Sequence, residues 1–579
     1  MVSLYNCFSI VGTVATPCLQ LHGLARVVAR VSSRPNTRGV LRWAMAVPEE
    51  LAKAIVDGRV TTRNELEQLK RELAAKDGLD RVPTDAEVLA IIGEDASPAA
   101  LSLLRTKPSR TLSGVAVVAV MTPPAPCPHG TCMYCPGGVD VGTPQSYTGK
   151  EPAAMRAGRA NYDGGRQTAD RLIQLSQVGH PTDKVELVVM GGTFPAVEAE
   201  ARSSFVKGCI EALNGAPSPD LASAIAANEG GDHRCVALTM ETRPDLCTEA
   251  GVDELLELGT TRVEIGVQVT EDRPLEIVGR GHGVAESVQA TRRIKDAGLK
   301  VGYHLMLGLP EMTPEADLRA LMRVFEDPEF RPDLLKLYPT LVMPGTGLHE
   351  LWMAGGYEPM YEDAAVGILA PFKAALPSWV RVSRVERDIP SNLIAAGVRA
   401  SNLRQLVAGR LTEEGKRCRC IRCREVGRRG TDRPRGEDKL WGSPDGARLE
   451  LIEERYEASG GQEAFLSLEL PEMDAIVAYA RVRRPSGELW REELSGAAIL
   501  REVRVLGAAL PLGAIPTDGE GSLAWQHRGL GRRLVNEAEE RALGWGMDRL
   551  AITAGMGTRA YFRRLGYDLD GPYMVRQLD

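Results

Sequence analysis

The sequence predicts an α/β protein in which a partial, parallel (β/α)6 barrel follows a helical N-terminal region and precedes a smaller α+β domain. Strand-like and helix-like segments alternate over residues 111–345, which is typical of parallel sheets. Apolar residues recur at helical spacing over residues 48–108. Three strand-like segments then follow one another at 464–470, 475–482 and 498–505, as in an antiparallel sheet. The strong barrel strands number fewer than eight, so we expect a barrel with an open side.

Length and composition narrow the class of protein. A chain of 579 residues exceeds what one hydrophobic core usually supports, so several domains are expected. Its 44% hydrophobic and 25% charged residues are ordinary for a globular protein. No run of about 18 apolar residues occurs, so we expect no membrane span. Eleven cysteines, six of them in two tight groups, indicate metal sites in a reducing compartment rather than a disulfide scaffold, which favours the cytoplasm.

The first residues differ from the rest of the chain. Residues 1–48 contain no Asp or Glu but carry five spaced arginines, at positions 26, 30, 34, 38 and 42. Such a segment can be a transit peptide. It can equally be an upstream extension with Met45 as the true start, because acidic and helix-forming residues begin just after it. We favour the second interpretation. In the helical region that follows, Thr62 or Asn64 is the expected N-cap of a helix.

A cysteine-rich loop follows the first predicted barrel strand, 114–120. Cys127, Cys132 and Cys135 lie within nine residues, between prolines and glycines that exclude regular helix or strand. A structural zinc takes four ligands, and His129 would have to supply the fourth. Alternatively, three thiolates hold a [4Fe–4S] cluster and leave its fourth iron free. The cysteines alone leave both alternatives open.

The later barrel strands end in small or polar residues, as strands do where they deliver functional groups to a barrel mouth. Gly191 and Gly192 follow one strand, although two adjacent glycines alone would suit a plain turn. Further candidates at strand ends are Glu241, Arg243, Glu264 and Gln268. His304 and Lys336 carry less weight, because a core histidine with satisfied hydrogen bonds is commoner than a functional one.

A second cysteine group, Cys418, Cys420 and Cys423, lies in a basic stretch, 399–435, with 12 Lys or Arg against 4 Asp or Glu. The spacing C-x-C-x2-C suits zinc with a fourth ligand from elsewhere, for which His349 and Asp388 are candidates. Free thiols are the alternative. The basic stretch can face phosphate groups or remain a solvated loop.

In the C-terminal domain a glycine loop runs into a helix. The loop reads Gln526-His-Arg-Gly529-Leu530-Gly531-Arg532 and comes after the antiparallel strands. Glycines there expose backbone N–H groups at a helix N-terminus, where a pyrophosphate can be held.

Taken in order, these motifs resemble the catalytic third subunit of Elongator in its bacterial or archaeal stand-alone form, from about Arg105 to the C-terminus. That family joins a radical S-adenosylmethionine (SAM) barrel to a GNAT acetyltransferase domain. The resemblance implies a [4Fe–4S] cluster on Cys127, Cys132 and Cys135, although the common radical SAM spacing is C-x3-C-x2-C and this one is C-x4-C-x2-C. It implies SAM contacts at Gly191, Gly192, Glu241, Glu264 and Gln268.

The resemblance also implies acetyl-CoA contacts in both domains. They fall on Lys184, Glu502, Val503, Arg504, Val505, Gln526, Gly529, Leu530, Gly531, Arg532 and Phe562. Lys184 and Tyr561 are the implied catalytic residues, with a solvent-exposed lysine as the alternative for Lys184. The family normally has a Tyr-Tyr pair where this chain has Tyr561-Phe562, so one hydroxyl is absent and its role would pass to Tyr561 or be lost.

The activity implied by the resemblance is modification of a tRNA at the wobble uridine, position 34 of the anticodon stem-loop. Cleavage of SAM gives a radical that takes a hydrogen from the acetyl methyl group of acetyl-CoA. The carbon radical adds to C5 of uridine, and thioester hydrolysis leaves 5-carboxymethyluridine. The reaction requires an electron donor. The chain is expected to act as a homodimer or without a further subunit. The alternative function is a protein lysine acetyltransferase with a structural Fe–S cluster.

The expected domains follow from these elements. They are an extension that is disordered or a misassigned start (1–45), a tRNA-binding helical region (46–110), the barrel (111–380), a linker with the second cysteine group (381–448) and the acetyltransferase domain (449–579). In the helical region, Lys107 and Arg110 are implied phosphate contacts.

Overall fold

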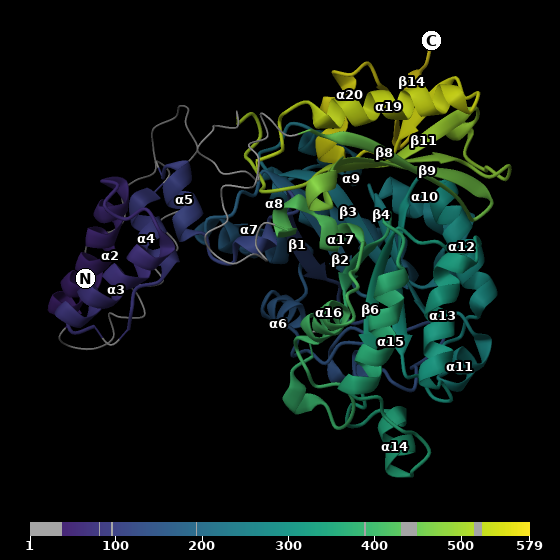
Figure 1. Cartoon of the computed structure of the whole chain (residues 1–579), viewed down its shortest axis with the longest axis horizontal. Coiled ribbons are helices and arrows are strands. Elements are labelled where there is room, and N and C mark those ends of the chain that lie inside the picture. Colours follow the sequence, from purple (N-terminus) through teal and green to yellow (C-terminus); the bar gives the residue numbers. More distant parts are fainter. Residues whose placement is uncertain are drawn as a thin grey trace. The chain divides into compact units, whose positions relative to one another are not determined.

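The computed structural model describes residues 37–79, 81–93, 96–192, 194–386, 389–429, 448–514 and 524–579. The chain divides into two compact units, Met1–Thr106 and Lys107–Asp579. Each unit is described by itself (Figure 1). Asp388, a candidate zinc ligand, lies outside the described residues, as does most of the predicted N-terminal extension.

The first unit is helical, as predicted. Its helices are α2 (Thr37–Val56), α3 (Arg63–Lys76), α4 (Asp85–Ile92) and α5 (Pro98–Leu104). Thr62 caps α3: its hydroxyl accepts from the Glu65 N–H, and the Glu65 carboxylate accepts from the Thr62 N–H, which forms a capping box. Helix α2 begins at Thr37, inside the segment that was expected to be an extension.

The second unit begins with a sheet of seven parallel strands in the order of the sequence. The predicted partial barrel is confirmed, with one more strand than expected. Strand β7 has four residues and lies just past the boundary predicted at 380, too short to give a sequence signal. The strands are β1 (Ala116–Met121), β2 (Lys184–Met190), β3 (Arg234–Thr242), β4 (Arg262–Gln268), β5 (Lys300–Leu307), β6 (Leu334–Pro339) and β7 (Arg381–Arg384).

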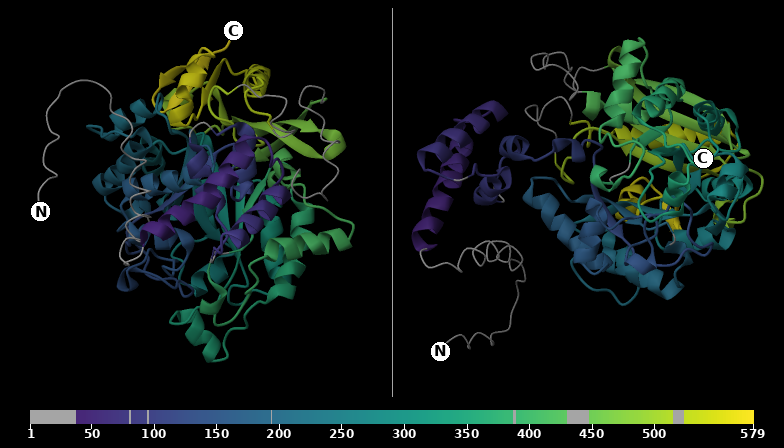
Figure 2. Two further views of the ribbon diagram at one scale, coloured as in Figure 1. Left: turned by 90° about the vertical axis from the view of Figure 1, so that its left-hand side faces the viewer. Right: turned by 90° about the horizontal axis from the view of Figure 1, so that it is seen from below.

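Helices cover the outer face of this half-barrel (Figures 1 and 2), and strand side chains line a cavity on its inner face. The alternation along β4 shows how this arises: Val263, Ile265 and Val267 are fully buried against the helices, whereas Arg262 and Glu264 line the interior. The main covering helices are α7 (Gly164–Gln177), α8 (Ala199–Asn214), α10 (Glu249–Glu257), α12 (Val284–Asp296), α13 (Pro314–Glu326) and α15 (Glu362–Ala375).

Shorter helices complete the second unit between the two sheets and around the loops. They are α6 (Pro152–Arg159), α9 (Leu221–Asn228), α11 (Asp272–Ile277), α14 (Gly347–Met353), α16 (Leu403–Glu413), α17 (Ile421–Arg424) and α18 (Val426–Arg429). In the part of the chain that the structure describes, no helix is both long and apolar enough to cross a membrane.

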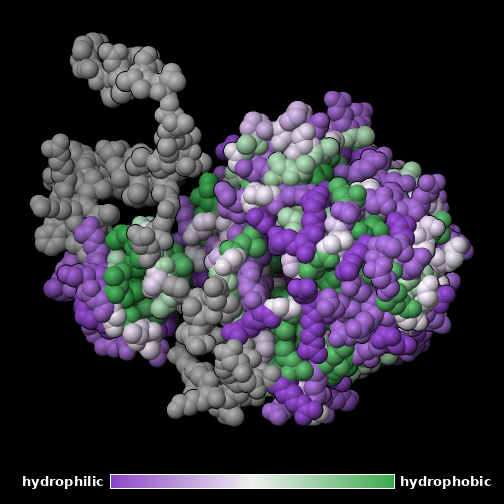
Figure 3. Space-filling view, turned by 90° about the horizontal axis from the view of Figure 1, so that it is seen from above, coloured by the Kyte–Doolittle hydropathy of each residue, from purple (hydrophilic) through white to green (hydrophobic). Residues whose placement is uncertain are grey.

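The C-terminal domain has a second sheet in the order β13-β14-β12-β11-β10-β9-β8. The three predicted strands are β9, β10 and β11, and they pair antiparallel as expected. The elements are β8 (Glu450–Ala458), β9 (Gly461–Leu470), β10 (Ala475–Arg484), β11 (Ala497–Val505), α19 (Leu530–Gly544), β12 (Arg549–Ile552), α20 (Arg559–Arg563), β13 (Asp568–Asp570) and β14 (Tyr573–Gln577). Hydrophilic residues cover most of the face seen in Figure 3.

Buried charges join the second sheet to the amino ends of the barrel strands. Asp333, just before β6, accepts from Arg501 of β11 at 2.7 Å, and Arg501 also contacts Glu463 at 2.8 Å. Lys295 at the end of α12 lies 3.2 Å from Glu463. These side chains are almost fully excluded from solvent, so each charge depends on its partner in the other domain.

Candidate active site inside the half-barrel

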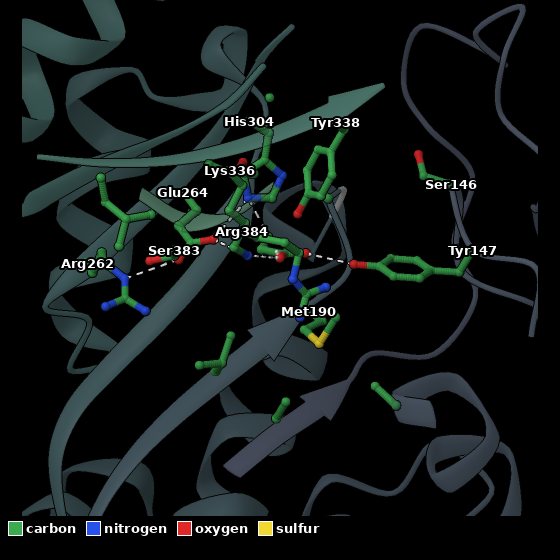
Figure 4. A pocket seen from close by; sticks show the side chains of 18 of the residues that line it. Ser146, Tyr147, Met190, Arg262, Glu264, His304, Lys336, Tyr338, Ser383 and Arg384 are labelled. Carbon is green, nitrogen blue, oxygen red and sulfur yellow. Dashed lines mark hydrogen bonds and ion pairs between the residues drawn. The ribbon is translucent and has the colours of Figure 1, made fainter. Parts of the chain in front are cut away.

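The interior of the half-barrel holds a cavity of about 360 Å³. Inward side chains of all seven strands line it. Cys127 and Gln268 lie where the strands end, whereas Glu186 and Arg381 lie where strands begin. Arg504 of the C-terminal domain also lines it. One cavity therefore extends from the cysteine loop to the seam between the two domains. Figure 4 shows part of its lining, with Glu264, His304 and Lys336 labelled.

The cysteine loop lies at the carboxyl end of the barrel. Cys132 and Cys135 are buried and Cys127 is partly exposed. His129 Nε2 lies 3.1 Å from the Cys132 sulfur, and Arg280 Nη1 lies 3.7 Å from it. The hydrogen bond from Cys135, together with His129 and Arg280, lowers the pKa of Cys132 to about 3. The loop is thus prepared to present a thiolate, the form that binds metals.

Among the described residues, the three sulfurs do not converge within 4.8 Å of one another, as the ligands of one ion would. As they stand, the three sulfurs therefore do not form a site for one ion, while Cys132 and Cys135 remain in hydrogen-bond contact with each other.

Of the two glycines after β2, Gly191 is required by its surroundings and Gly192 is not. Gly191 has φ +133°, and a Cβ there would collide with the Thr122 hydroxyl. Its N–H donates to Glu241 Oε2 at 3.4 Å. Gly192 lines the cavity with open space around its Cα. The backbone can therefore approach a ligand closely at Gly192.

Four charged or polar side chains meet in the middle of the cavity: Glu241, Glu264, His304 and Lys336. Lys336 Nζ lies 3.1 Å from Glu241 Oε1 and also pairs with Glu264, and His304 Nε2 lies 2.9 Å from Glu264 Oε2. Burial would raise the pKa of both carboxyls, but Lys336 and the other basic and hydrogen-bonding groups around them together outweigh burial and lower both pKa values. The side chains of Glu241, Glu264 and His304 have the spacing of metal ligands, but the Lys336 ammonium already supplies the positive charge between them.

The cavity includes His304 and Lys336, the two candidates that the sequence supported less than the other strand-end residues. The strand register pairs His304 with Lys336, and both point inward beside Glu264. The signal available in the sequence was alternation: each is a polar residue at an inward position of an otherwise apolar strand.

The floor of the cavity is a chain of ion pairs. Glu186 of β2 lies 2.7 Å from Arg262 Nη2 and 3.1 Å from Arg504 Nη2. Arg504 Nε also donates to the Ser113 carbonyl at 3.3 Å. The side chain of Arg504 thus turns toward the barrel, and only its backbone remains for an acetyl-CoA contact. Glu502, another predicted contact, accepts from Tyr479 at 3.1 Å and from Arg481 at 2.9 Å.

At the seam, Lys184 of β2 meets the glycine loop of the C-terminal domain. Its Nζ donates to Gln526 Oε1 at 2.6 Å. The Gln526 amide in turn donates to the carbonyls of Gly114 at 3.1 Å and Val505 at 3.3 Å. Burial lowers the pKa of Lys184 to about 8. Lys184 is therefore an interdomain contact and not a solvent-exposed lysine.

The glycine loop has the backbone expected for pyrophosphate binding. Gly529 has φ +79° and is the N-cap of α19, so the first N–H groups of the helix, at Leu530, Gly531 and Arg532, lack intrahelical partners. A Cβ on Gly531 would lie 3.2 Å from the Tyr561 hydroxyl, which places Tyr561 over this turn. Phe562 packs in the domain core against Tyr567, and Val503 and Val505 pack at the edge of that core.

The second cysteine group has the geometry of a site for one ion. The sulfurs of Cys418, Cys420 and Cys423 lie within 4.8 Å of one another. Contact with Cys418 and Cys423 lowers the pKa of Cys420. Among the described residues no fourth ligand joins them: His349 lies on α14 beside Trp352, with ring centroids 5.8 Å apart.

Comparison with known sequences matches three families: the ELP3 N-terminal domain over residues 44–112, the Radical SAM superfamily over 123–323 and the Radical_SAM C-terminal domain over 332–413. The tRNA uridine(34) acetyltransferase of Methanocaldococcus jannaschii is 43% identical over 534 residues, which cover 90% of this chain and 95% of the relative. Elongator complex protein 3 of Homo sapiens is 41% identical over 524 residues, which cover 89% and 93%.

A solved structure agrees with this. The archaeal Methanocaldococcus infernus Elp3 with an N-terminal deletion is 41% identical, covers 81% of this chain and 100% of its own, and superposes with a TM-score of 0.70. The chain belongs to the radical SAM family of tRNA uridine(34) acetyltransferases and Elongator complex protein 3.

Proposed function

We propose that this chain modifies the wobble uridine of tRNA and that its product is 5-carboxymethyluridine, made from acetyl-CoA by radical SAM chemistry. The observation that carries this proposal is the bond between Lys184 and Gln526, which brings the barrel against the glycine loop. A contact between the barrel and the proposed acetyl-CoA loop within one compact unit supports a reaction that uses both. Attachment of an acetyl-derived carbon to a base is such a reaction.

In this proposal Cys127, Cys132 and Cys135 hold a [4Fe–4S] cluster. When bound, the cluster supplies the electron that cleaves SAM. Gly191, Gly192, Glu241, Glu264 and Gln268 surround the place for SAM, and all but Gly191 line the cavity. The positive φ of Gln268, +70°, turns the chain at the end of β4. Arg243 and Arg280 offset negative charge near the thiolates.

Acetyl-CoA is held from the C-terminal domain. The N–H groups of Leu530, Gly531 and Arg532 bind its pyrophosphate, and the strand 502–505 lies along its pantetheine arm. Lys184 donates a hydrogen bond to the thioester oxygen in place of Gln526, and Tyr561 supplies the hydroxyl that Phe562 lacks. Both are then catalytic residues.

The tRNA phosphates lie on a cationic rim of the same cavity. Arg110, Arg381, Arg384, Arg422 and Arg428 line it, and Arg422 and Arg428 come from the predicted basic stretch. Lys107, which precedes Arg110 in the same short segment, is exposed and has a φ of +54°. Arginine clusters of this kind bind nucleic-acid backbones without reading sequence.

Cys418, Cys420 and Cys423 hold a structural zinc whose fourth ligand comes from outside the described group. A tetrahedral zinc with Zn–S bonds of about 2.3 Å separates its sulfurs by about 3.8 Å, which agrees with their convergence. The site lies beside the barrel edge, where the Ile421 N–H donates to the Val380 carbonyl at 2.8 Å. We further propose a cytoplasmic protein that receives its electron from a separate donor.

The test is anaerobic reconstitution with SAM, dithionite, acetyl-CoA and tRNA, followed by nucleoside mass spectrometry. Wild type should yield a carboxymethyl adduct on uridine. Cys132→Ala should yield none, whereas Cys247→Ala, which removes a buried thiol outside the loop, should retain it. Cleaved SAM with unmodified uridine would overturn the proposal. Lysine acetylation without SAM or reductant would then favour the protein acetyltransferase.

A further inference from the structure

Strands β5 and β6 contribute a wall of the cavity to which the proposed function assigns no role. His304, Lys336 and Tyr338 lie together on this wall (Figure 4). The rings of His304 and Tyr338 stand edge to face, with centroids 5.6 Å apart and planes at 82°. Tyr147 lies on the opposite side and donates to Glu241 at 3.1 Å. The wall combines an aromatic ring with hydrogen-bonding groups, which is the composition of a base pocket.

The hydrogen bonds within this wall determine which of its groups can donate to a bound base and which can accept from it. Burial, with help from Lys336, lowers the pKa of His304, which favours the neutral ring. The carboxylate of Glu264 takes the Nε2–H of this ring at 2.9 Å, which leaves Nδ1 as a hydrogen-bond acceptor. The Lys336 ammonium carries three donors, and Glu241 and Glu264 engage two of them. The residues that carry this acceptor and this donor are paired across β5 and β6.

Uracil is complementary to this pair and cytosine is not. Uracil presents an acceptor, O4, next to a donor, N3–H. Cytosine presents a donor, N4–H2, next to an acceptor, N3. With C5 turned toward the incoming carbon, uracil faces Lys336 with O4 and His304 with N3–H. Cytosine in the same position would set donor against donor and acceptor against acceptor, which costs binding because polar groups are left unpaired.

We propose that Lys336 and His304 read the Watson–Crick edge of the flipped base at position 34 and select uridine over cytidine, with Tyr338 packing against the base. This inference rests on the proposed function and adds specificity-determining residues to it. Glu264 is a positioning residue, because it fixes the His304 tautomer and one hydrogen of Lys336. The arginine rim holds the backbone and is indifferent to the base, so discrimination has to come from this wall.

The test pairs substitutions in the protein with single-atom changes in the RNA. Anticodon stem-loops with uridine, cytidine or 3-methyluridine at position 34 are titrated against the cluster-loaded protein without reductant, so that binding is measured apart from turnover. Wild type should bind the cytidine and 3-methyluridine loops about 10- to 100-fold more weakly than the uridine loop.

His304→Ala removes the imidazole, so the 3-methyl group can occupy its place and no acceptor remains without a donor. The loss of affinity for the 3-methyluridine loop, relative to the uridine loop, should therefore fall to about 3-fold or less. In Lys336→Met, the loss of affinity for the cytidine loop, relative to the uridine loop, should fall in the same way. Ser383→Ala changes another cavity-lining residue and should keep both penalties. Penalties are ratios within one protein, so a general loss of affinity does not change them.

Unchanged penalties in both variants would overturn the inference. Circular dichroism and iron content identify a misfolded variant, and then the other variant decides. Failure of the proposed function looks different: wild type would leave uridine unmodified in the turnover assay. A wild type that modifies uridine but binds all three loops equally refutes base reading alone.

Discussion

Lys184 at the start of β2 donates a 2.6 Å hydrogen bond to Gln526, 342 residues later in the chain. The bond joins a barrel strand to the loop that opens α19. Because Gln526 is also held by Gly114 and Val505, the contact has a single geometry rather than being a chance surface encounter. It is the point at which the two halves of the proposed reaction meet.

Lys184→Met should lower kcat/KM for acetyl-CoA by about 10- to 100-fold, because it removes a charge-assisted hydrogen bond at the thioester. Kinetics of nucleoside formation at varied acetyl-CoA measure this. Lys207→Met, which removes a partly exposed lysine of α8 paired with Glu211, should leave it unchanged. Equal values for wild type and Lys184→Met would contradict a catalytic role.

The same lysine predicts a pH dependence of stability. Its pKa of about 8 in the folded chain lies below the value of about 10.4 for a free lysine. Between these values the unfolded chain binds more protons here, so the free energy of unfolding rises with pH. We expect urea titrations between pH 8 and 10 to show a smaller rise for Lys184→Met than for wild type. Parallel curves would refute the lowered pKa.

Tyr561→Phe should weaken acetyl-CoA binding about 5-fold, the effect of one neutral hydrogen bond. The hydroxyl lies over Gly531, whereas the ring of Phe562 is buried between Tyr561 and Tyr567. Calorimetric titration measures the Kd. Tyr567→Phe, whose hydroxyl donates to Glu539 at 2.6 Å, is the matched control and should bind normally. An unaltered Kd in Tyr561→Phe would mean that the family's tyrosine function is absent here.

Asp333→Ala should lower the free energy of unfolding by about 3 to 5 kcal/mol, because it leaves Arg501 buried without its main partner. Denaturant titration measures this, with tryptophan fluorescence and circular dichroism as probes. Asp570→Ala removes the half-exposed partner of Arg549 and should cost less than about 1 kcal/mol. Similar losses in both variants would show that the network contributes no more than a surface pair.

Elemental analysis should separate the two cysteine groups. Cys420→Ser should lose zinc and retain iron, whereas Cys132→Ala should lose iron and retain zinc, since only the sulfurs of the second group converge as the ligands of one zinc ion do. Loss of both metals in Cys420→Ser would indicate that the second group supports the fold of the cluster loop. Full zinc in Cys420→Ser would rule out the proposed zinc site.

Much of this protein follows from local sequence. The alternation of strands and helices, the Thr62 capping box, the cysteine spacing and the glycine at 529 each depend on neighbours a few residues away. Short-range sterics and hydrogen bonding decide such features, so they can be read from the chain in order. The order of these motifs also sufficed for the family resemblance.

The tertiary structure alone decided which distant side chains meet. Strand register brings His304 and Lys336 to Glu264, and the docking of the second sheet turns Arg504 toward Glu186 and joins Lys184 to Gln526. Alternation along a strand fixes only the face on which a side chain lies, whereas the pairing of strands and the docking of the second sheet decide which side chain it meets there. Residue types therefore predicted the chemistry, whereas the packing of the strands and of the two domains decided its partners.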